Sequence, residues 1–195
     1  MSSFVGHGLA ALTIGKAFEE NTTFKQKVLW QTGLLLCAVA PDIDYLVRPL
    51  NSINNGGLRI THSIAFSLIL PILLTLFFFL FERKNIIQKG IQACLAGLSH
   101  IFLDLLVGSR HGDPIFYPLL KKEITLPFGI LPSAGRISFS NYYFYRNLLI
   151  EIGILIPAFT LILFLAGKFK INRLMIIGLL SVLITFLIWS VNLNR

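Results

Sequence analysis

His100 and Asp104 lie four residues apart in the apolar stretch 98-LSHIFLDLL-106. On a helix this spacing places both side chains on one face, just over one turn apart. An imidazole and a carboxylate that project together can bind one metal ion. Burying the Asp in lipid without a partner would cost about 2.5–3.5 kcal/mol. The pair therefore indicates either a metal site or a polar contact between two helices.

Four further residues of metal-binding type lie in the short motifs GHG, PDID and THS: His7, Asp42, Asp44 and His62. His62 begins one apolar stretch and Asp104 lies near the end of the next. Successive spanning helices run antiparallel, so we expect these two residues on the same side of the membrane. The PDID carboxylates and His7 join them if residues 27–40 do not cross. All these residues could then converge at one membrane interface.

Mixed imidazole and carboxylate ligands suit Zn²⁺, with Mn²⁺ or Fe²⁺ as alternatives. Six such groups exceed the three or four that one tetrahedral site takes, so we expect one or two ions. Two ions about 3.5–4 Å apart would polarise a phosphoryl or acyl oxygen and lower the pKa of a bound water toward roughly 7. Arg59, just before His62, could bind a phosphate or pair with an Asp. We expect Arg59 and Asp44 to act in catalysis.

Other polar residues are weaker candidates. His111 and Asp113 share the loop 110-RHGDP-114 and could add ligands. Glu151 is predicted to be an interfacial carboxylate within a turn of a helix start. Ser63 and Ser99 neighbour histidines but lack a GxSxG context, so no serine hydrolase is indicated.

The composition is that of an integral membrane protein. Hydrophobic residues make up 55% and charged residues 13%, against about 25% charged residues in soluble domains. The net charge of +8 fits basic residues that set topology and contact lipid head groups. No nucleic-acid-binding module is visible. We therefore expect membrane lipids, and no nucleic acid, as partners.

The sequence predicts an all-α integral membrane protein with about four transmembrane helices plus one or two interfacial or re-entrant helices. The spans are expected at 64–81, 86–107, 148–167 and 174–193, with a kink at Pro71. Residues 4–18 and 27–40 are shorter helices, the second interfacial or re-entrant. A long non-helical connection is expected at 108–147. We expect the chain to divide into three parts: a metal-binding membrane domain over 1–120, an interfacial loop over 121–147 and a C-terminal transmembrane helix pair over 148–195.

Orientation follows from the short connections 82–89 and 168–173, which must share a side if four helices span. They are rich in basic residues, so this side is predicted to be cytoplasmic. The metal site would then face the extracytoplasmic side of a multi-pass protein. The N-terminus lacks a basic region and a cleavage site, which indicates mature protein rather than a signal peptide.

The motifs together resemble the YdjM/DUF457 family of inner-membrane metal-dependent hydrolases. The resemblance covers about residues 5–120 and rests on these positions: His7, Asp42, Asp44, Arg59, His62, Ser63, Ser99, His100, Asp104, Tyr117 and Pro118. It implies a bacterial inner (plasma) membrane location and metal-dependent hydrolysis. The family label also mentions LexA binding, which no residue here supports. One departure is Tyr45, where many members have His after PDID.

We expect a membrane-bound metal-dependent hydrolase acting on a phosphoester or lipid-type substrate at the membrane interface. The alternative is a metal-binding membrane protein without turnover, namely a transporter, sensor or structural protein. A transporter should place polar groups at mid-membrane on several helices. Here the polar groups gather at helix ends, and the 64–81 helix carries no charge.

Overall fold

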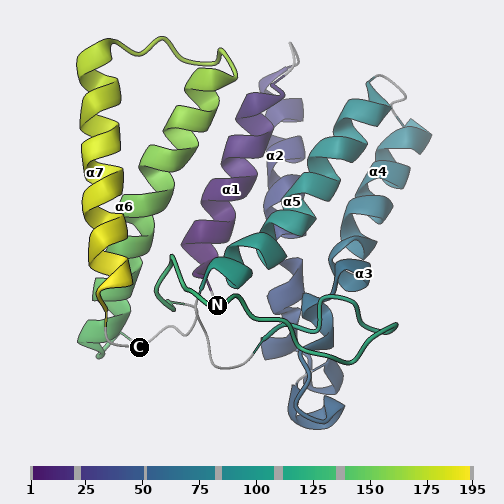
Figure 1. The fold of residues 1–195 in the computed structure, drawn as a ribbon. Coiled ribbons are helices and arrows are strands. Elements are labelled where there is room, and N and C mark those ends of the chain that lie inside the picture. Colours follow the sequence, from purple (N-terminus) through teal and green to yellow (C-terminus); the bar gives the residue numbers. More distant parts are fainter. Residues whose placement is uncertain are drawn as a thin grey trace.

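The computed structural model describes residues 2–19, 23–50, 52–81, 85–107, 112–134 and 139–193. Within these ranges the fold is helical and has no extended strand, as predicted (Figure 1). The helices are α1 (Phe4–Ala17), α2 (Phe24–Val39), α3 (Ile64–Ser67), α4 (Ile69–Phe81), α5 (Ile86–Leu106), α6 (Tyr142–Leu165) and α7 (Arg173–Val191). Between α2 and α3 lie four 3₁₀ turns: η1 (Ala40–Tyr45), η2 (Arg48–Leu50), η3 (Ser52–Asn55) and η4 (Ile60–His62).

Four segments of the described chain are long and apolar enough to cross a membrane: Ile64–Phe81, Ile86–Leu106, Tyr142–Leu165 and Arg173–Val191. They correspond to the four predicted spans, which confirms the fold class. One boundary was wrong. Asn141 caps α6 by accepting from the Tyr143 N–H, so the helix already begins at Tyr142. The aromatic run 142-YYFYR-146 therefore belongs to the helix and not to the connection.

The predicted kink in the 64–81 span is a break between α3 and α4 at Leu68. Pro71 has no N–H to donate to the carbonyl of Ser67, so the helical ladder is interrupted there. Gly97 of α5 packs directly against the Ser67 carbonyl, and a Cβ at Gly97 would clash with it. The break therefore lets α5 approach the 64–81 span closely.

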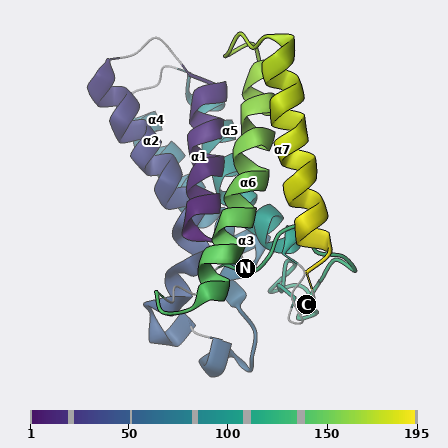
Figure 2. The same cartoon turned by 90° about the vertical axis from the view of Figure 1, so that its left-hand side faces the viewer.

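The first two helices form an antiparallel pair that packs against α5, and α1 also contacts α6 (Figure 2). Small residues dominate the core that joins α1, α2 and α5, with Ala11, Cys37, Ala38, Ala93 and Ala96 all fully buried. Such residues let helix backbones approach closely. Cys37 is thus a small buried hydrophobe.

The antiparallel pairing corrects one condition of the sequence argument. The sequence predicts that His7 reaches the other ligands only if residues 27–40 do not cross the membrane. His7 lies near the start of α1 and Asp42 lies just after the end of α2. Because α1 runs away from this end of the bundle and α2 returns to it, the two residues meet whatever depth the pair reaches (Figure 1).

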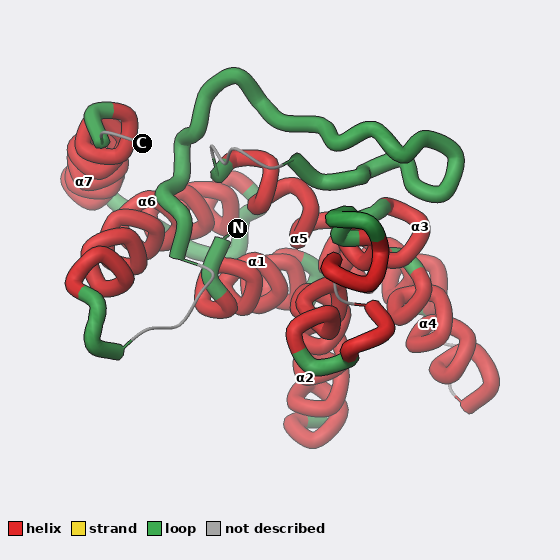
Figure 3. Tube along the Cα trace, turned by 90° about the horizontal axis from the view of Figure 1, so that it is seen from below, coloured by secondary structure: helices red, strands yellow, loops and turns green. Residues whose placement is uncertain are grey.

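The connections 85–89 and 168–173 lie together at the opposite end of the bundle, where Ile87 and Lys168 border one hollow. This confirms that they share a side, although Arg83 and Lys84 lie outside the described residues. Residues 112–134 run across the end that carries His7 and Asp42 (Figure 3). Backbone hydrogen bonds from Ile64 N to Ile115 O (3.0 Å) and from Ile130 N to Leu106 O (2.8 Å) attach this connection to the helices.

Candidate metal centre

Five of the six predicted ligands converge at one end of the bundle. They come from four elements and are almost completely buried: His7 on α1 (0% exposed), Asp42 on η1 (5%), His62 on η4 (0%), and His100 (0%) and Asp104 (4%) on α5. Two overlapping groups within this cluster have ligand atoms close enough to hold a metal ion, one with His62, His100 and Asp104 and one with His7, Asp42 and His100.

The first group forms a compact triangle of ligand atoms. His62 Nε2 lies 3.2 Å from His100 Nε2, and Asp104 Oδ2 lies 3.4 Å from His62 Nε2 and 3.6 Å from His100 Nε2. Ligand atoms at tetrahedral Zn–N distances of about 2.0–2.1 Å are separated by about 3.3 Å. The three separations therefore match one face of a tetrahedral zinc site.

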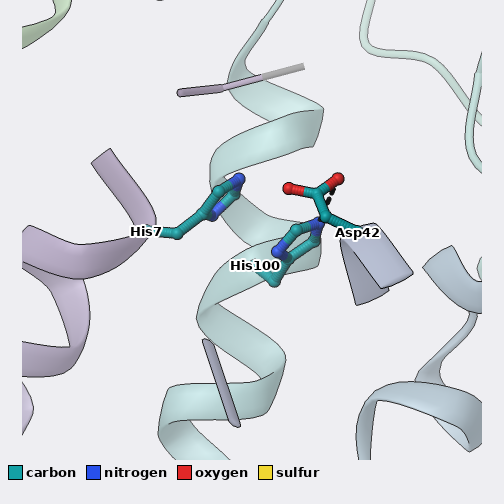
Figure 4. Close-up of side chains that lie close together, drawn as sticks. All are labelled: His7, Asp42 and His100. Carbon is teal, nitrogen blue, oxygen red and sulfur yellow. Dashed lines mark ion pairs between the residues drawn. The ribbon is translucent and has the colours of Figure 1, made fainter. Parts of the chain in front are cut away.

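In the second group, His7 and Asp42 lie beside the His100 ring (Figure 4). The His7 ring stacks on the His100 ring at a centroid distance of 3.8 Å and an interplanar angle of 10°. Asp42 Oδ1 lies 3.9 Å from His100 Nε2 and 3.5 Å from His62 Nε2. Neither ring nitrogen of His7 has a hydrogen-bond partner among the described residues, and the same holds for Asp104 Oδ2. Buried polar atoms of this kind are normally satisfied, so they point to a bound group.

A backbone carbonyl sets the tautomer of His100, and a hydroxyl contacts His62. His100 Nδ1 lies 2.8 Å from the carbonyl oxygen of Ala38. A carbonyl oxygen only accepts, so Nδ1 carries the proton and Nε2 keeps its lone pair. His62 Nδ1 lies 3.0 Å from Thr61 Oγ1, a hydroxyl that can either donate to this nitrogen or accept from it. Metal-binding histidines typically use one ring nitrogen as ligand and donate from the other.

When His62 carries its proton on Nδ1, two lone pairs face each other across 3.2 Å, and a cation between them removes their repulsion. Burial lowers the pKa of His62, but the neighbouring carboxylates of Asp104 and Asp42 raise it to about 9. Burial likewise raises the pKa of Asp42, but hydrogen bonding to His62 and the nearby imidazoles of His100 and His7 together bring the carboxyl pKa below its usual value. A proton on His62 can therefore occupy the position that a metal ion would take.

Asp44, the sixth predicted ligand, faces Arg59 instead. The guanidinium donates to both carboxylate oxygens, Nε to Oδ2 at 2.8 Å and Nη2 to Oδ1 at 2.9 Å. The same Nη2 donates to Asp42 Oδ1 at 3.3 Å. Arg59 also lies 5.1 Å from the centre of the Tyr45 ring, which is the position where the sequence departs from the family pattern. Arg59 thus links the two carboxylates of PDID.

A hydrogen-bonded segment supports Asp104 and was missed from the sequence. The Ser2 N–H donates to Asp104 Oδ1 at 2.7 Å, and the Ser3 N–H donates to Glu151 Oε1 at 2.9 Å. The Ser2 hydroxyl also donates to Glu151 Oε1. Glu151 is completely buried, and the prediction that it lies within a turn of the helix start was wrong. The cause is the earlier start of α6, which moves Glu151 well past the first turn of the helix.

Of the two weaker candidates in the following connection, only Asp113 lies within the described residues. His111 lies outside the described residues. Asp113 pairs with Ile124 through backbone hydrogen bonds and belongs to neither ligand group. Burial raises the pKa of its carboxyl to about 6.

The residues present fit a metal ion. The cluster has imidazole and carboxylate donors, buried polar atoms without a hydrogen-bond partner among the described residues, and a fixed tautomer at His100. This donor set could hold Zn²⁺ or a similar divalent cation.

The model of the YdjM inner membrane protein family matches residues 1–193, so the chain belongs to this family. The family match and the four apolar spans make it a membrane protein. No curated protein and no solved structure shows a significant match to the chain.

Proposed function

We propose that this protein is a membrane-bound metal-dependent hydrolase that acts on a phosphoester or lipid-type substrate at the membrane interface. The observation that carries the proposal is the triangle of His62, His100 and Asp104, whose ligand atoms are separated by 3.2–3.6 Å. These residues would hold the ion, with Asp42 and His7 beside them. When bound there, a divalent cation supplies Lewis acidity, which polarises an ester oxygen and activates water near neutral pH.

The geometry favours one ion over two in this arrangement. His100 is shared by both candidate groups. Its Nδ1 is engaged by the Ala38 carbonyl, so only Nε2 is left to bind a metal. If one ion takes His100, the other group keeps only two of its residues, and a second ion would need further ligands. Zn²⁺ is the preferred ion, with Mn²⁺ or Fe²⁺ as alternatives.

Arg59 is proposed to bind the phosphate of the substrate. Its side chain is 18% exposed, more than any of the metal-binding residues, and it borders the cluster through Asp42. The bidentate contact with Asp44 fixes the plane of the guanidinium. This contact favours a positioning role for Asp44 over a role as metal ligand. The basic connections at the opposite end support an extracytoplasmic site.

The burial of the cluster also favours a second candidate function. Its ligand side chains are at most 5% exposed, and the 112–134 connection crosses the same end. A metal held there without turnover would join α1, η1, η4 and α5. In that case the protein is a non-catalytic metal-binding membrane protein, with the ion as a structural element.

Metal content and turnover of the purified protein distinguish the two functions. The variants are His100→Ala and, as control, Phe102→Ala, which removes an exposed side chain of the same helix (62% exposed). We expect stoichiometric metal and phosphodiesterase or lipase activity in the parent and in Phe102→Ala. We expect His100→Ala to lose both the metal and the activity. Stoichiometric metal without turnover on any phosphoester or lipid would favour the structural function. An absence of metal from the parent would refute both.

A further inference from the structure

A cavity lies at the end of the bundle opposite the metal centre. It encloses about 390 Å³ between the last turns of α1, the first turns of α2 and α5, and α4. This volume is within the range of about 300–1,000 Å³ that is usual for ligand sites. One part of its wall is apolar and includes Leu12, Trp30 and Phe78. Another part is formed by the lysines Lys16, Lys27 and Lys89.

The charges that line this cavity are predominantly positive. Among the described residues, three lysines and one carboxylate, Glu19, border it, which gives these lining residues a net charge of 3 − 1 = +2. Lys27 Nζ contacts Glu19 Oε1 at 2.8 Å, and Lys16 contacts the other carboxylate oxygen. A single carboxylate shared by two ammonium groups leaves an excess of positive charge at the rim.

Lys89 brings positive charge deeper into the cavity wall. Lys89 is only 6% exposed and lies within the predicted span that contains α5. The ammonium lies 5.0 Å from the centre of the Phe78 ring and 5.9 Å from that of Trp30. Trp30 is itself fixed, because its indole N–H donates to Gln92 Oε1 at 2.7 Å. The aromatic wall and the cation therefore adjoin one another in a defined arrangement.

We propose that this cavity binds an anionic phospholipid of the surrounding membrane. Its phosphate would lie near Lys16, Lys27 and Lys89, and one acyl chain would lie along Trp30, Phe78 and Leu12. Basic pockets between transmembrane helices are suited to anionic lipid head groups. The apolar wall favours an amphiphile over free phosphate, and the positive lining favours an anionic over a zwitterionic lipid. The site is independent of the metal centre, which lies at the other end of the helices.

Trp30 in the cavity wall provides a direct readout. The protein carries two tryptophans, so a Trp189→Phe background leaves Trp30 as the only fluorophore of this type. The protein is reconstituted in vesicles that contain brominated-acyl phosphatidylglycerol or brominated-acyl phosphatidylcholine, which quench tryptophan on contact. We expect phosphatidylglycerol to quench Trp30 at several-fold lower mole fraction than phosphatidylcholine.

Charge variants test the lysines. Lys16→Gln and Lys27→Gln, at exposed positions where folding should be kept, should each weaken the preference for phosphatidylglycerol by about fivefold or less, the equivalent of about 1 kcal/mol per basic residue. Glu19→Gln should strengthen the preference for phosphatidylglycerol, because it removes the negative charge of the lining. Unfolding of the variant would not have this effect. The matched control is Lys25→Gln, an exposed lysine of α2 outside the lining.

Three results would overturn the proposal. The first is equal quenching of Trp30 by the two lipids. The second is a Lys25→Gln effect as large as that of Lys16→Gln, which would show a general surface-charge effect. The third is full relief of quenching by millimolar inorganic phosphate, which would show that the cavity takes a free anion. Persistence of quenching in phosphate, together with the Glu19→Gln gain, would support a lipid site.

Discussion

The backbone N–H of Ser2 donates a hydrogen bond to Asp104 Oδ1 across 102 positions of sequence, at 2.7 Å. The other oxygen of the same carboxylate, Oδ2, faces His62 and His100. One carboxylate is thus held by the N-terminal segment and directed toward the imidazoles. Glu151 of α6 fixes this segment through Ser2 and Ser3, so a fifth element contributes to the geometry of the cluster.

Glu151 is therefore predicted to be a positioning residue for the metal centre. Glu151→Ala removes the acceptor of both serines and should lower Zn²⁺ affinity by about 10–100-fold, the usual effect of losing a group that orients a ligand. Glu151→Gln keeps an acceptor oxygen and should have a smaller effect. Zn²⁺ competition with a chromophoric chelator measures both. The control is Glu123→Gln in the connection, and an unchanged affinity in Glu151→Ala would contradict the prediction.

Thr61 offers a test of the His62 tautomer. Thr61→Val removes the acceptor for His62 Nδ1 while keeping the shape of the side chain. We expect roughly tenfold weaker Zn²⁺ binding, because Nε2 would no longer be fixed as the ligand nitrogen. Thr61→Ser keeps the hydroxyl and should bind Zn²⁺ like the parent. Equal losses in the two variants would indicate a packing effect instead.

The pairing of Asp44 with Arg59 predicts that these residues affect turnover more than metal content. Asp44→Asn weakens the contact that fixes the guanidinium, and Arg59→Lys loses its bidentate geometry. Both variants should retain stoichiometric Zn²⁺ and lose phosphodiesterase activity, with non-additive effects in the double variant because the two side chains act as one unit. Loss of metal in Asp44→Asn would instead identify this residue as a ligand.

Removal of the metal should destabilise the protein. Without an ion, buried carboxylates and imidazoles at this end lack full compensation. An ion present at a hundredfold excess over its Kd stabilises the folded state by about 2.7 kcal/mol. Thermal unfolding in detergent should therefore occur at lower temperature after chelation and recover with Zn²⁺. His100→Ala should show no such response, and a parent protein insensitive to chelation would contradict the prediction.

Much of this site follows from local spacing. The i, i+4 separation of His100 and Asp104 fixes a shared helix face, and the alternating direction of spans places His62 beside them. The PDID motif was harder to interpret, because a 3₁₀ turn has about three residues per turn, so residues two apart point in different directions. Asp42 faces the imidazoles and Asp44 faces Arg59 for this reason.

The support from Ser2, Ser3 and Glu151 had no sequence signal. Serine is common at helix starts, and Ser3 caps α1 by accepting from the Gly6 N–H. This local role accounts for a serine at position 3, so the residue type gives no indication of the contact with Glu151. The burial of Glu151 depends on where α6 begins and on which helix packs against it. Neither property is encoded in the residues next to Glu151.

Gly97 tests the close packing of α5 against the broken 64–81 span. A Cβ at this position would clash with the carbonyl oxygen of Ser67 and with Pro71, and this carbonyl belongs to backbone that has little room to move. We expect Gly97→Ala to lower the free energy of unfolding by about 1–3 kcal/mol, the usual cost of overpacking. It should also weaken Zn²⁺ binding, because His62 lies just before α3 and His100 lies on α5. Gly178→Ala is the matched control, since no atom lies within 4 Å of a Cβ there. Denaturant unfolding in detergent measures both variants, and equal stability would show that α5 and the span can separate without cost.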